Sequence, residues 1–300
     1  MFSPFVTAMK ILCLAEFVMG ILLNAFIVVA NAVSWMERKP LDSIDLILTS
    51  LGLSRLALLI TWLLYVLSED RYEHIEILNV MSSFFGFCSL WFGTVLCTFY
   101  CVKIPNYNHR FFLYVKLRIS KMIPWLLLVS VTSSFISSLP IGWSMDSSMF
   151  HYNSTNGTNM ETTLYLPFFI YVAGNSVPFF MFCVAITLLI RSLWNHTRQM
   201  AAGEVGFGTP QLQAHYSAIR CMMSFMVLYI IFSSSVFLAL PMVLMNDTLL
   251  WLYLFIAGLY PSLHSHILIL SNRKLRRALC SLLSYTSTFI PQERNISPCQ

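Results

Sequence analysis

Seven apolar stretches, each long enough to cross a bilayer, constrain this 300-residue chain more than any other feature. A transmembrane helix needs about 20 predominantly apolar residues. The chain is 57% hydrophobic and 10% charged, whereas soluble domains carry about 25% charged residues. The stretches lie near 11–33, 44–67, 80–102, 122–141, 164–190, 221–245 and 249–270. We therefore predict an all-α membrane protein, a seven-transmembrane helix bundle over residues 1–271, with a tail over 272–300.

The basic residues predict the orientation of this bundle. If the N-terminus is outside, every Lys and Arg except Lys10, Arg55 and Arg71 falls in a cytoplasmic segment. Short cytoplasmic loops of membrane proteins carry such an excess of basic residues. The outer segments are acidic and hold Glu69, Asp70, Glu73, Glu76, Asp146, Glu161 and Asp247. We therefore expect the N-terminus outside and the C-terminus in the cytoplasm.

This orientation also sorts the Asn-x-Ser/Thr sequons, which accept sugar only outside the cytoplasm. The sequon at Asn195 lies on the cytoplasmic side, where it should stay bare. Those at Asn153 and Asn156 share one polar outer loop and predict N-glycosylation. Chance occurrence in a loop rich in Ser, Thr and Asn is the alternative. Asn246 is also outside, in a turn that looks too tight for the glycosylating enzyme.

One fixed charge, Arg55, lies near the middle of the second apolar stretch. A charge at the bilayer centre costs about 2.5–3.5 kcal/mol on insertion scales, so it should face the bundle interior and find partners. Asn24 reaches a similar depth in the first stretch. We predict an Asn24–Arg55 contact, extended by carbonyls or hydroxyls of the seventh stretch such as Ser262 or Ser265. The alternative is that Arg55 snorkels toward a water-filled vestibule.

Two further side chains with possible chemistry lie near the end of the bundle. His264, in the seventh stretch, is predicted to be a core histidine bonded to a neighbouring helix. A metal site would need more ligands close by, so we expect neither a metal nor a cofactor. Cys280 follows the last stretch in a basic context, where it could carry palmitate or be an inert thiol.

Four segments near the cytoplasmic ends of the third, fifth, sixth and seventh stretches carry recognisable patterns. They read LWFGTVLCTFYCVKI (90–104), LLIRSLWNHTRQM (188–200), TPQLQAHYSAIRCMMSFMVLY (209–229) and YPSLHSHILILSNRKLRR (260–277). With Asn24 and the LSRL around Arg55, they resemble the bitter taste receptors (type 2 taste receptors), a family of seven-helix G-protein-coupled receptors. The resemblance spans nearly the whole chain in order and is weakest in the outer loops.

The resemblance implies a plasma-membrane receptor for bitter small molecules that signals through a gustducin-type or inhibitory heterotrimeric G protein to calcium release. The ligand would enter from outside and lodge among the second, third, fifth, sixth and seventh helices, in a largely apolar pocket. By depth and helical facing, the candidates are Trp62, Tyr65, Ser82, Ser83, Gly86, Phe87, Tyr171, Asn175, Ser235, Tyr253 and Ala257. For each aromatic residue the alternative is core packing or contact with lipid.

The inner face carries cationic and hydrogen-bonding residues that the resemblance assigns to the G protein. They are Tyr100, Lys103, His196, Met200, His215 and Arg220. Anchoring to anionic membrane lipid is the alternative role for basic residues here. The segment NRKLRRALCSLLS, after the seventh stretch, looks like a short amphipathic helix lying on the membrane. Pairing with a second copy or a related receptor is possible, and no nucleic-acid partner is expected.

Other functions remain open from the sequence alone. A multi-pass transporter is one, although transporters tend to show internal repeats and intramembrane carboxylates, and we find no repeat. A seven-helix receptor of another class is a second. An intramembrane enzyme is not expected, because the chain has no His-Glu-x-x-His motif, no paired intramembrane aspartates and no phosphate-cradling glycine loop.

Overall fold

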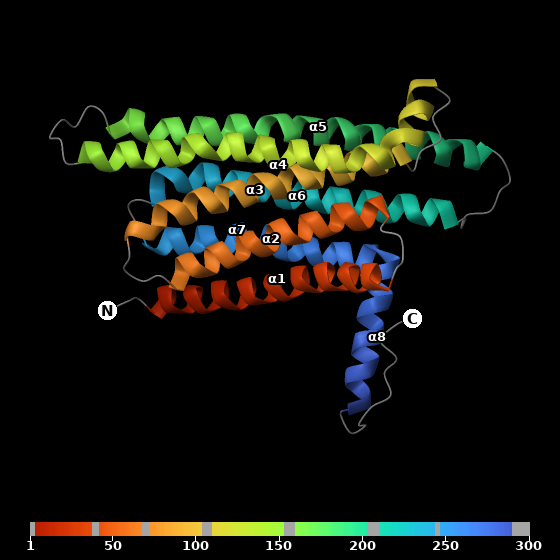
Figure 1. The fold of residues 1–300 in the computed structure, drawn as a ribbon, viewed down its shortest axis with the longest axis horizontal. Coiled ribbons are helices and arrows are strands. Elements are labelled where there is room, and N and C mark those ends of the chain that lie inside the picture. The colour runs from red at the N-terminus through yellow and green to blue at the C-terminus, as the bar shows by residue number, and fades with distance from the viewer. Residues whose placement is uncertain are drawn as a thin grey trace.

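The computed structural model describes residues 4–37, 42–67, 72–103, 110–152, 160–202, 210–243 and 247–289, and these are almost entirely helical. The helices are α1 (Pro4–Met36), α2 (Ser43–Leu67), α3 (Tyr72–Lys103), α4 (Arg110–Tyr152), α5 (Met160–Ala202), α6 (Pro210–Val243), α7 (Asp247–Ser271) and α8 (Arg273–Phe289). Helices α1 to α7 run side by side along one direction, and α8 leaves the bundle across that direction (Figure 1). The predicted all-α bundle is confirmed.

The length and composition of the helices fit a membrane protein. Six of them, α1 to α5 and α7, are long and apolar enough to cross a bilayer, and α6 holds a shorter apolar segment, Ile219–Ser235. Some helices are much longer than the apolar stretches within them. Helix α4 has 43 residues, or about 65 Å at 1.5 Å per residue, whereas the hydrocarbon core is about 30 Å thick. It extends at both ends beyond the predicted stretch 122–141, because apolar composition marks only the part of a helix that lies in lipid and not where the helix ends.

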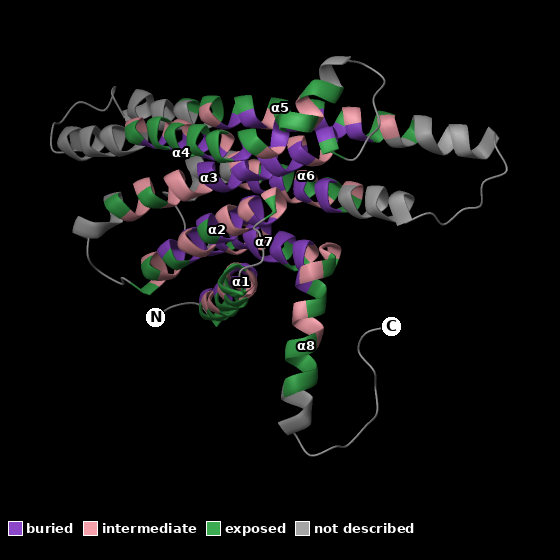
Figure 2. Cartoon of the chain, turned by 45° about the vertical axis from the view of Figure 1, so that its right-hand side comes forward, coloured by how far each residue is buried: buried purple, intermediate pink, exposed green. Residues whose placement is uncertain are grey.

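Two clusters of buried apolar side chains fill the bundle. The first joins α1, α2, α3, α5, α6 and α7, and the second joins α1 to α4 with the first part of α6, the end of α7 and the start of α8. Buried residues line the facing sides of α2, α3, α6 and α7, while exposed ones run along α1, α4 and α5 (Figure 2). The exposed side chains are themselves apolar, as Trp125 and Phe180 show, each 70% exposed. Apolar surface on this scale fits lipid rather than water.

Helix α3 approaches a side chain of α6 closely at Gly93, and this contact gives a test of the packing. A Cβ at Gly93 would lie 2.5 Å from two ring carbons of Phe225, a buried ring that packs 4.8 Å from the ring of Phe182. We expect Gly93→Ala to destabilise the receptor by about 1–3 kcal/mol, because the ring has no room to move. Thermal unfolding of detergent-solubilised receptor measures this.

Gly86→Ala is the matched control for that substitution, since it adds the same methyl group to the same helix. A Cβ at Gly86 would meet no described atom within 4 Å. Equal melting temperatures for the Gly93→Ala and Gly86→Ala receptors would contradict the close packing of α3 against α6.

Candidate functional site

Arg55 lies fully buried in α2 and contacts three hydroxyl groups. Its Nε donates to Ser89 Oγ at 3.1 Å, on α3. Its Nη1 donates to Ser265 Oγ at 3.3 Å, and Nη2 to the Tyr260 hydroxyl at 3.5 Å, both on α7. The guanidinium also lies 5.1 Å from the centre of the Tyr260 ring. Within the described residues no carboxylate forms a salt bridge with Arg55, so hydroxyls and one aromatic ring stabilise its charge.

Asn24 of α1 joins this network through Ser265. The Ser265 hydroxyl lies 2.7 Å from both Asn24 Oδ1 and the Pro261 carbonyl, either of which can accept its single proton. Asn24 Nδ2 donates to the Gly20 carbonyl at 2.8 Å. The predicted contact between Asn24 and Arg55 is therefore indirect, because the Ser265 hydroxyl lies between them. The other hydroxyl proposed for this role, that of Ser262, is buried without a hydrogen-bond partner in the described part of the chain.

Ser89 and Tyr260 complete the network, with their hydroxyls 3.2 Å apart. Sequence reasoning missed both residues. Their signal was present, since each is a polar side chain in an apolar stretch at about the depth of Arg55. Depth alone does not reveal which way a side chain faces, so their contact with the guanidinium could not be predicted. Polar contacts thus hold α1, α2, α3 and α7 together at one level of the bundle.

His264 lies one residue before Ser265 and faces α6. Its Nε2 is 3.7 Å from Cys221 Sγ, and its ring centre is 5.0 Å from that of Phe225. His264 Nδ1 is buried with no hydrogen-bond partner among the described residues. This histidine therefore packs on a neighbouring helix, and no group of three or more possible metal ligands occurs in the described ranges.

The candidate ligand residues separate into packing residues and residues beside open space. Trp62 and Ala257 are buried in the first apolar cluster, and Tyr65 and Tyr253 pack against it. The Trp62 ring centre lies 6.0 Å from that of Phe17 in α1. These four residues of α2 and α7 form part of the core, which was the alternative considered for the aromatic candidates.

A second group of candidates lies on α3 and α5. Phe87 is buried and fills the space beside Gly174, where a Cβ would lie 3.1 Å from its ring. Asn175 is buried next to that glycine. Ser82 and Ser83 are half-buried, whereas the side chain of Tyr171 lies outside the described residues.

Two candidate serines use their hydroxyls within their own helices. Ser82 Oγ donates to the Asn79 carbonyl at 2.9 Å, and Ser235 Oγ donates to the Phe232 carbonyl at 2.7 Å. Such bonds satisfy the hydroxyl proton locally. Both oxygens keep acceptor capacity for a ligand donor.

Gly86 differs from the other candidates because the space beside it is open. Residues 86, 89 and 93 lie on one face of α3, since they are three and four positions apart. Ser89 on this face contacts α2 and α7, and Gly93 approaches α6. A Cβ at Gly86 would meet nothing within 4 Å among the described residues, although the backbone there is only half-exposed. Among the described residues, the face of α3 that looks toward α2, α6 and α7 therefore has open space at Gly86.

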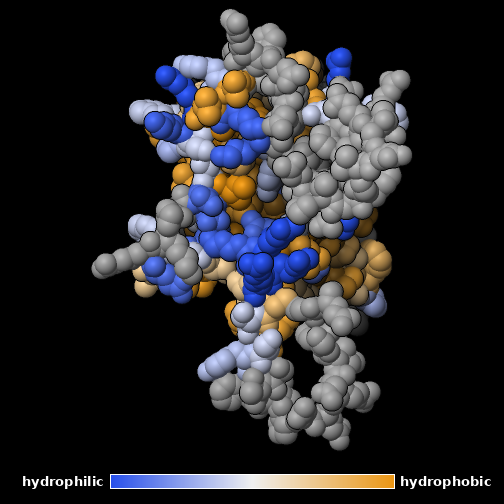
Figure 3. All heavy atoms as spheres, turned by 90° about the vertical axis from the view of Figure 1, so that its right-hand side faces the viewer, coloured by the Kyte–Doolittle hydropathy of each residue, from blue (hydrophilic) through white to orange (hydrophobic). Residues whose placement is uncertain are grey.

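Three candidate coupling residues lie where α3 ends and α6 begins, at the other end of the bundle from Gly86: Tyr100, Lys103 and Arg220. Tyr100 is half-buried, with its ring centre 6.2 Å from that of Phe99. Lys103 is exposed, with Nζ 3.5 Å from Ser120 Oγ, and Arg220 on α6 is exposed as well. Hydrophilic residues gather over this end of the molecule between apolar flanks (Figure 3).

Several predicted sites fall on residues whose geometry is not described. The side chains of His196, Met200 and His215 lie outside the described residues, and so do the sequons at Asn153 and Asn156. Glycosylation and the contribution of these three side chains to coupling remain predictions from the sequence.

Comparison with known proteins gives one consistent family. A family model described as taste receptor protein (TAS2R) matches residues 1–287. The chain is 34% identical over 299 residues to taste receptor type 2 member 7 of Papio hamadryas, covering 92% of this chain and 93% of that protein. It is 34% identical over 304 residues to taste receptor type 2 member 7 of Rattus norvegicus, covering 95% and 96%. Taste receptor type 2 member 119 of Rattus norvegicus is 35% identical over 283 residues, covering 88% and 81%.

Proposed function

Because this chain belongs to the taste receptor type 2 family, we propose that it binds bitter small molecules beside α3 and signals through a gustducin-type G protein to calcium release. Membership of the family makes it a bitter taste G-protein-coupled receptor and a multi-pass membrane protein. The transporter and the receptor of another class are thereby set aside. The plasma membrane is the proposed location, with the N-terminus outside and the C-terminus in the cytoplasm.

The open space at Gly86 is the observation that carries the ligand site. Ligand pockets are concave and mostly apolar, with a few polar groups. The position of Gly86 fits this description, because the polar Ser82 lies one turn away on α3 and the partly buried Phe85, beside Gly86 in the chain, packs against the first apolar cluster. We propose that the bitter ligand occupies this space, between the extracellular halves of α2, α3, α6 and α7.

The basic residues at the other end support the proposed coupling face. Lys103 and Arg220 are exposed there on α3 and α6. In the orientation that the basic residues favour, this end faces the cytoplasm. An agonist acts on this face only through a difference in its affinity for two receptor states. The proposed ligand space and coupling face share α3 and α6, so a shift of α6 against α3 would change both.

Calcium imaging in transfected cells tests the proposed function. Cells expressing the tagged receptor with a gustducin-type α subunit are exposed to a panel of chemically diverse bitter compounds, with surface expression measured in parallel. We expect concentration-dependent calcium release for some compounds and no release in matched cells that lack the α subunit. Silence across the whole panel from a receptor present at the surface would contradict the proposal.

A further inference from the structure

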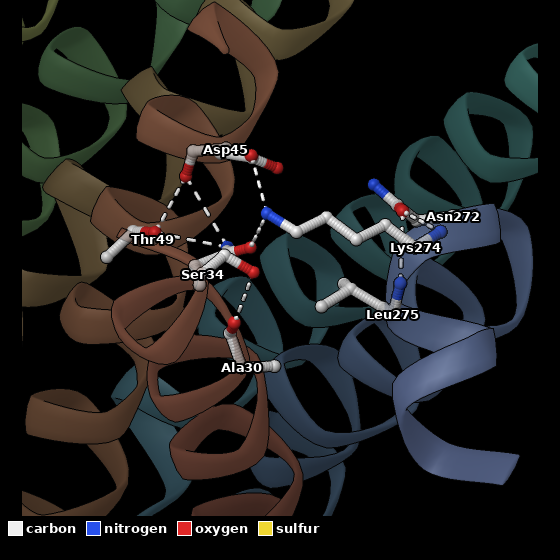
Figure 4. Close-up of polar contacts among 8 residues, drawn as sticks. Ala30, Ser34, Asp45, Thr49, Asn272, Lys274 and Leu275 are labelled. Carbon is white, nitrogen blue, oxygen red and sulfur yellow. Dashed lines mark hydrogen bonds and ion pairs between the residues drawn. The ribbon is translucent and has the colours of Figure 1, made fainter. Parts of the chain in front are cut away.

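A polar cluster at the start of α8 fixes this helix to α1 and α2 (Figure 4). Lys274 Nζ lies 2.6 Å from Asp45 Oδ2, in the first turn of α2. It also donates to Asn31 Oδ1 of α1 at 3.3 Å. The side chains of Asp45 and Lys274 are 11% and 37% exposed, so this ion pair is partly shielded from water. Partial burial reduces the screening by solvent and salt that weakens exposed ion pairs.

Asn31 and Thr49 hold the acceptors of this ion pair in place. Asn31 Nδ2 donates to Thr49 Oγ1 at 3.1 Å, while its Oδ1 accepts from Lys274. Thr49 Oγ1 in turn donates to the Asp45 carbonyl at 2.7 Å. The buried Asn31 amide is therefore oriented by bonds on both of its ends. We call Asn31, Asp45 and Lys274 the α8 clasp.

The start of α8 has a second fixed point next to the clasp. Asn272 Oδ1 accepts from the backbone nitrogens of Lys274, at 2.9 Å, and Leu275, at 3.2 Å. This is the N-cap arrangement, which satisfies backbone donors that a first helical turn leaves free. The cap fixes where α8 begins, directly after α7 ends at Ser271. It leaves the rotation of α8 about its own axis undetermined.

The α8 clasp fixes the rotation of α8 about its own axis. Leu275 is fully buried in the second apolar cluster, and Leu279, one turn on, packs against that cluster. Leu282 and Leu283 continue the same side of the helix beyond the bundle and are exposed. On a helical projection at 100° per residue, Lys274 lies about 80° from Leu282 and about 100° from Leu275, beside this apolar side. An ion pair at this position holds the leucines toward the bundle and the membrane.

The charges of α8 make such a partner necessary. Four basic residues lie in its first turns, where the positive end of the helix dipole disfavours cations: Arg273, Lys274, Arg276 and Arg277. Arg273, Arg276 and Arg277 are exposed. On the helical projection, Arg273 and Arg277 lie on the side away from Leu275, whereas Arg276 lies next to Leu283. Lys274 is the one that reaches a carboxylate among the described residues.

We propose that Lys274 is a positioning residue whose ion pair with Asp45 sets the rotation of α8. The clasp keeps the leucine side of α8 on the bundle and the membrane and turns Arg273 and Arg277 toward the space beside the coupling face. The effect on coupling rests on the proposed function, whereas the effect on α8 itself does not.

A reciprocal charge exchange tests the clasp in the full-length receptor. Lys274→Glu and Asp45→Lys each remove the ion pair, and the double variant restores it with the charges reversed. Amide hydrogen exchange over 275–285 reports the docking of α8. We expect about tenfold faster exchange in each single variant, the factor given by about 1.4 kcal/mol, with most of the protection returning in the double variant. Arg276→Glu is the matched control, because it makes the same charge change at an exposed position of the same helix.

Signalling is measured on the same receptors, at equal surface level, with the strongest agonist of the wild type. We expect the agonist potency to fall about tenfold in both single variants and to recover in the double variant. If Lys274→Glu does not reach the surface, Lys274→Gln replaces it. Unchanged exchange in both single variants, or no recovery in the double variant, overturns the clasp. Faster exchange with unchanged potency overturns its role in coupling. A silent wild type with normal exchange contradicts the proposed function alone.

Discussion

Replacing Arg55 by alanine should lower the amount of folded receptor at the cell surface by about tenfold or more. The variant loses three hydrogen bonds from a charged group, each worth about 1.5–3 kcal/mol, and leaves a cavity in the core. Removing the charge returns only its insertion cost of about 2.5–3.5 kcal/mol. The stabilisation lost with the hydrogen bonds and the cavity exceeds the insertion cost that is removed. Surface immunolabelling and the melting temperature of solubilised receptor measure the result.

Two further variants show whether this effect belongs to the network. Ser54→Ala changes the neighbouring buried residue, whose hydroxyl donates to a carbonyl of its own helix, that of Leu51, at 2.9 Å. It should behave almost as the wild type. Arg55→Lys keeps the charge but lacks the planar fork of donors that reaches both α3 and α7, so its surface level should be intermediate. An Arg55→Ala receptor with normal surface level and melting temperature would show that the network contributes little.

Filling the space at Gly86 should weaken the agonist without unfolding the receptor. A phenylalanine there enters volume that no described atom occupies within 4 Å of the new Cβ. If the ligand uses this volume, Gly86→Phe should raise the half-maximal agonist concentration at least about tenfold, a loss of about 1.4 kcal/mol of binding. The melting temperature should stay close to that of the wild type, because the added ring begins in space where the new Cβ meets no described atom. Calcium dose–response curves with the strongest agonist of the panel measure the change.

Met81→Phe is the matched control for Gly86→Phe. It adds an aromatic ring to the same helix at a side chain that is 41% exposed on the surface of the structure. Its dose–response curve should match the wild type. Equal agonist potency in the Gly86→Phe receptor and the wild type would place the ligand elsewhere.

The bundle was predictable because the bilayer imposes a length and a composition on each helix. The ends of the helices were not. Apolar residues mark only the part of a helix that lies in lipid, so the stretch 122–141 gave no sign that α4 runs from Arg110 to Tyr152. Helix α6 shows the same limit, since the predicted stretch 221–245 gave no sign that the helix begins at Pro210.

The polar core was predictable in outline. A charge at mid-depth requires partners, and this requirement led to Asn24 and Ser265. It did not reveal that Ser265 bridges the two, because a bridge depends on the rotation of α7. Lys274 was counted only as a marker of the cytoplasmic side. Its partner Asp45 lies 229 residues earlier in the chain, and no local pattern links two residues so far apart.

The ligand site was the least predictable part. Depth placed Trp62 and Phe87 among the candidates, but both side chains are buried in packing contacts. Gly86 was chosen as a small residue on the expected wall, and the free volume beside it now supports that choice. A side chain packs in the core or contacts a ligand according to the direction in which it points. That direction depends on how the neighbouring helices lie.

The proposed function depends above all on the orientation of the bundle in the membrane. If the chain were inverted, the proposed ligand space and the coupling face would exchange places. Epitope tags at the N-terminus and at the C-terminus, labelled in intact and in permeabilised cells, test this directly. We predict that the N-terminal tag is labelled in intact cells and the C-terminal tag only after permeabilisation. Labelling of the C-terminal tag in intact cells would contradict the account.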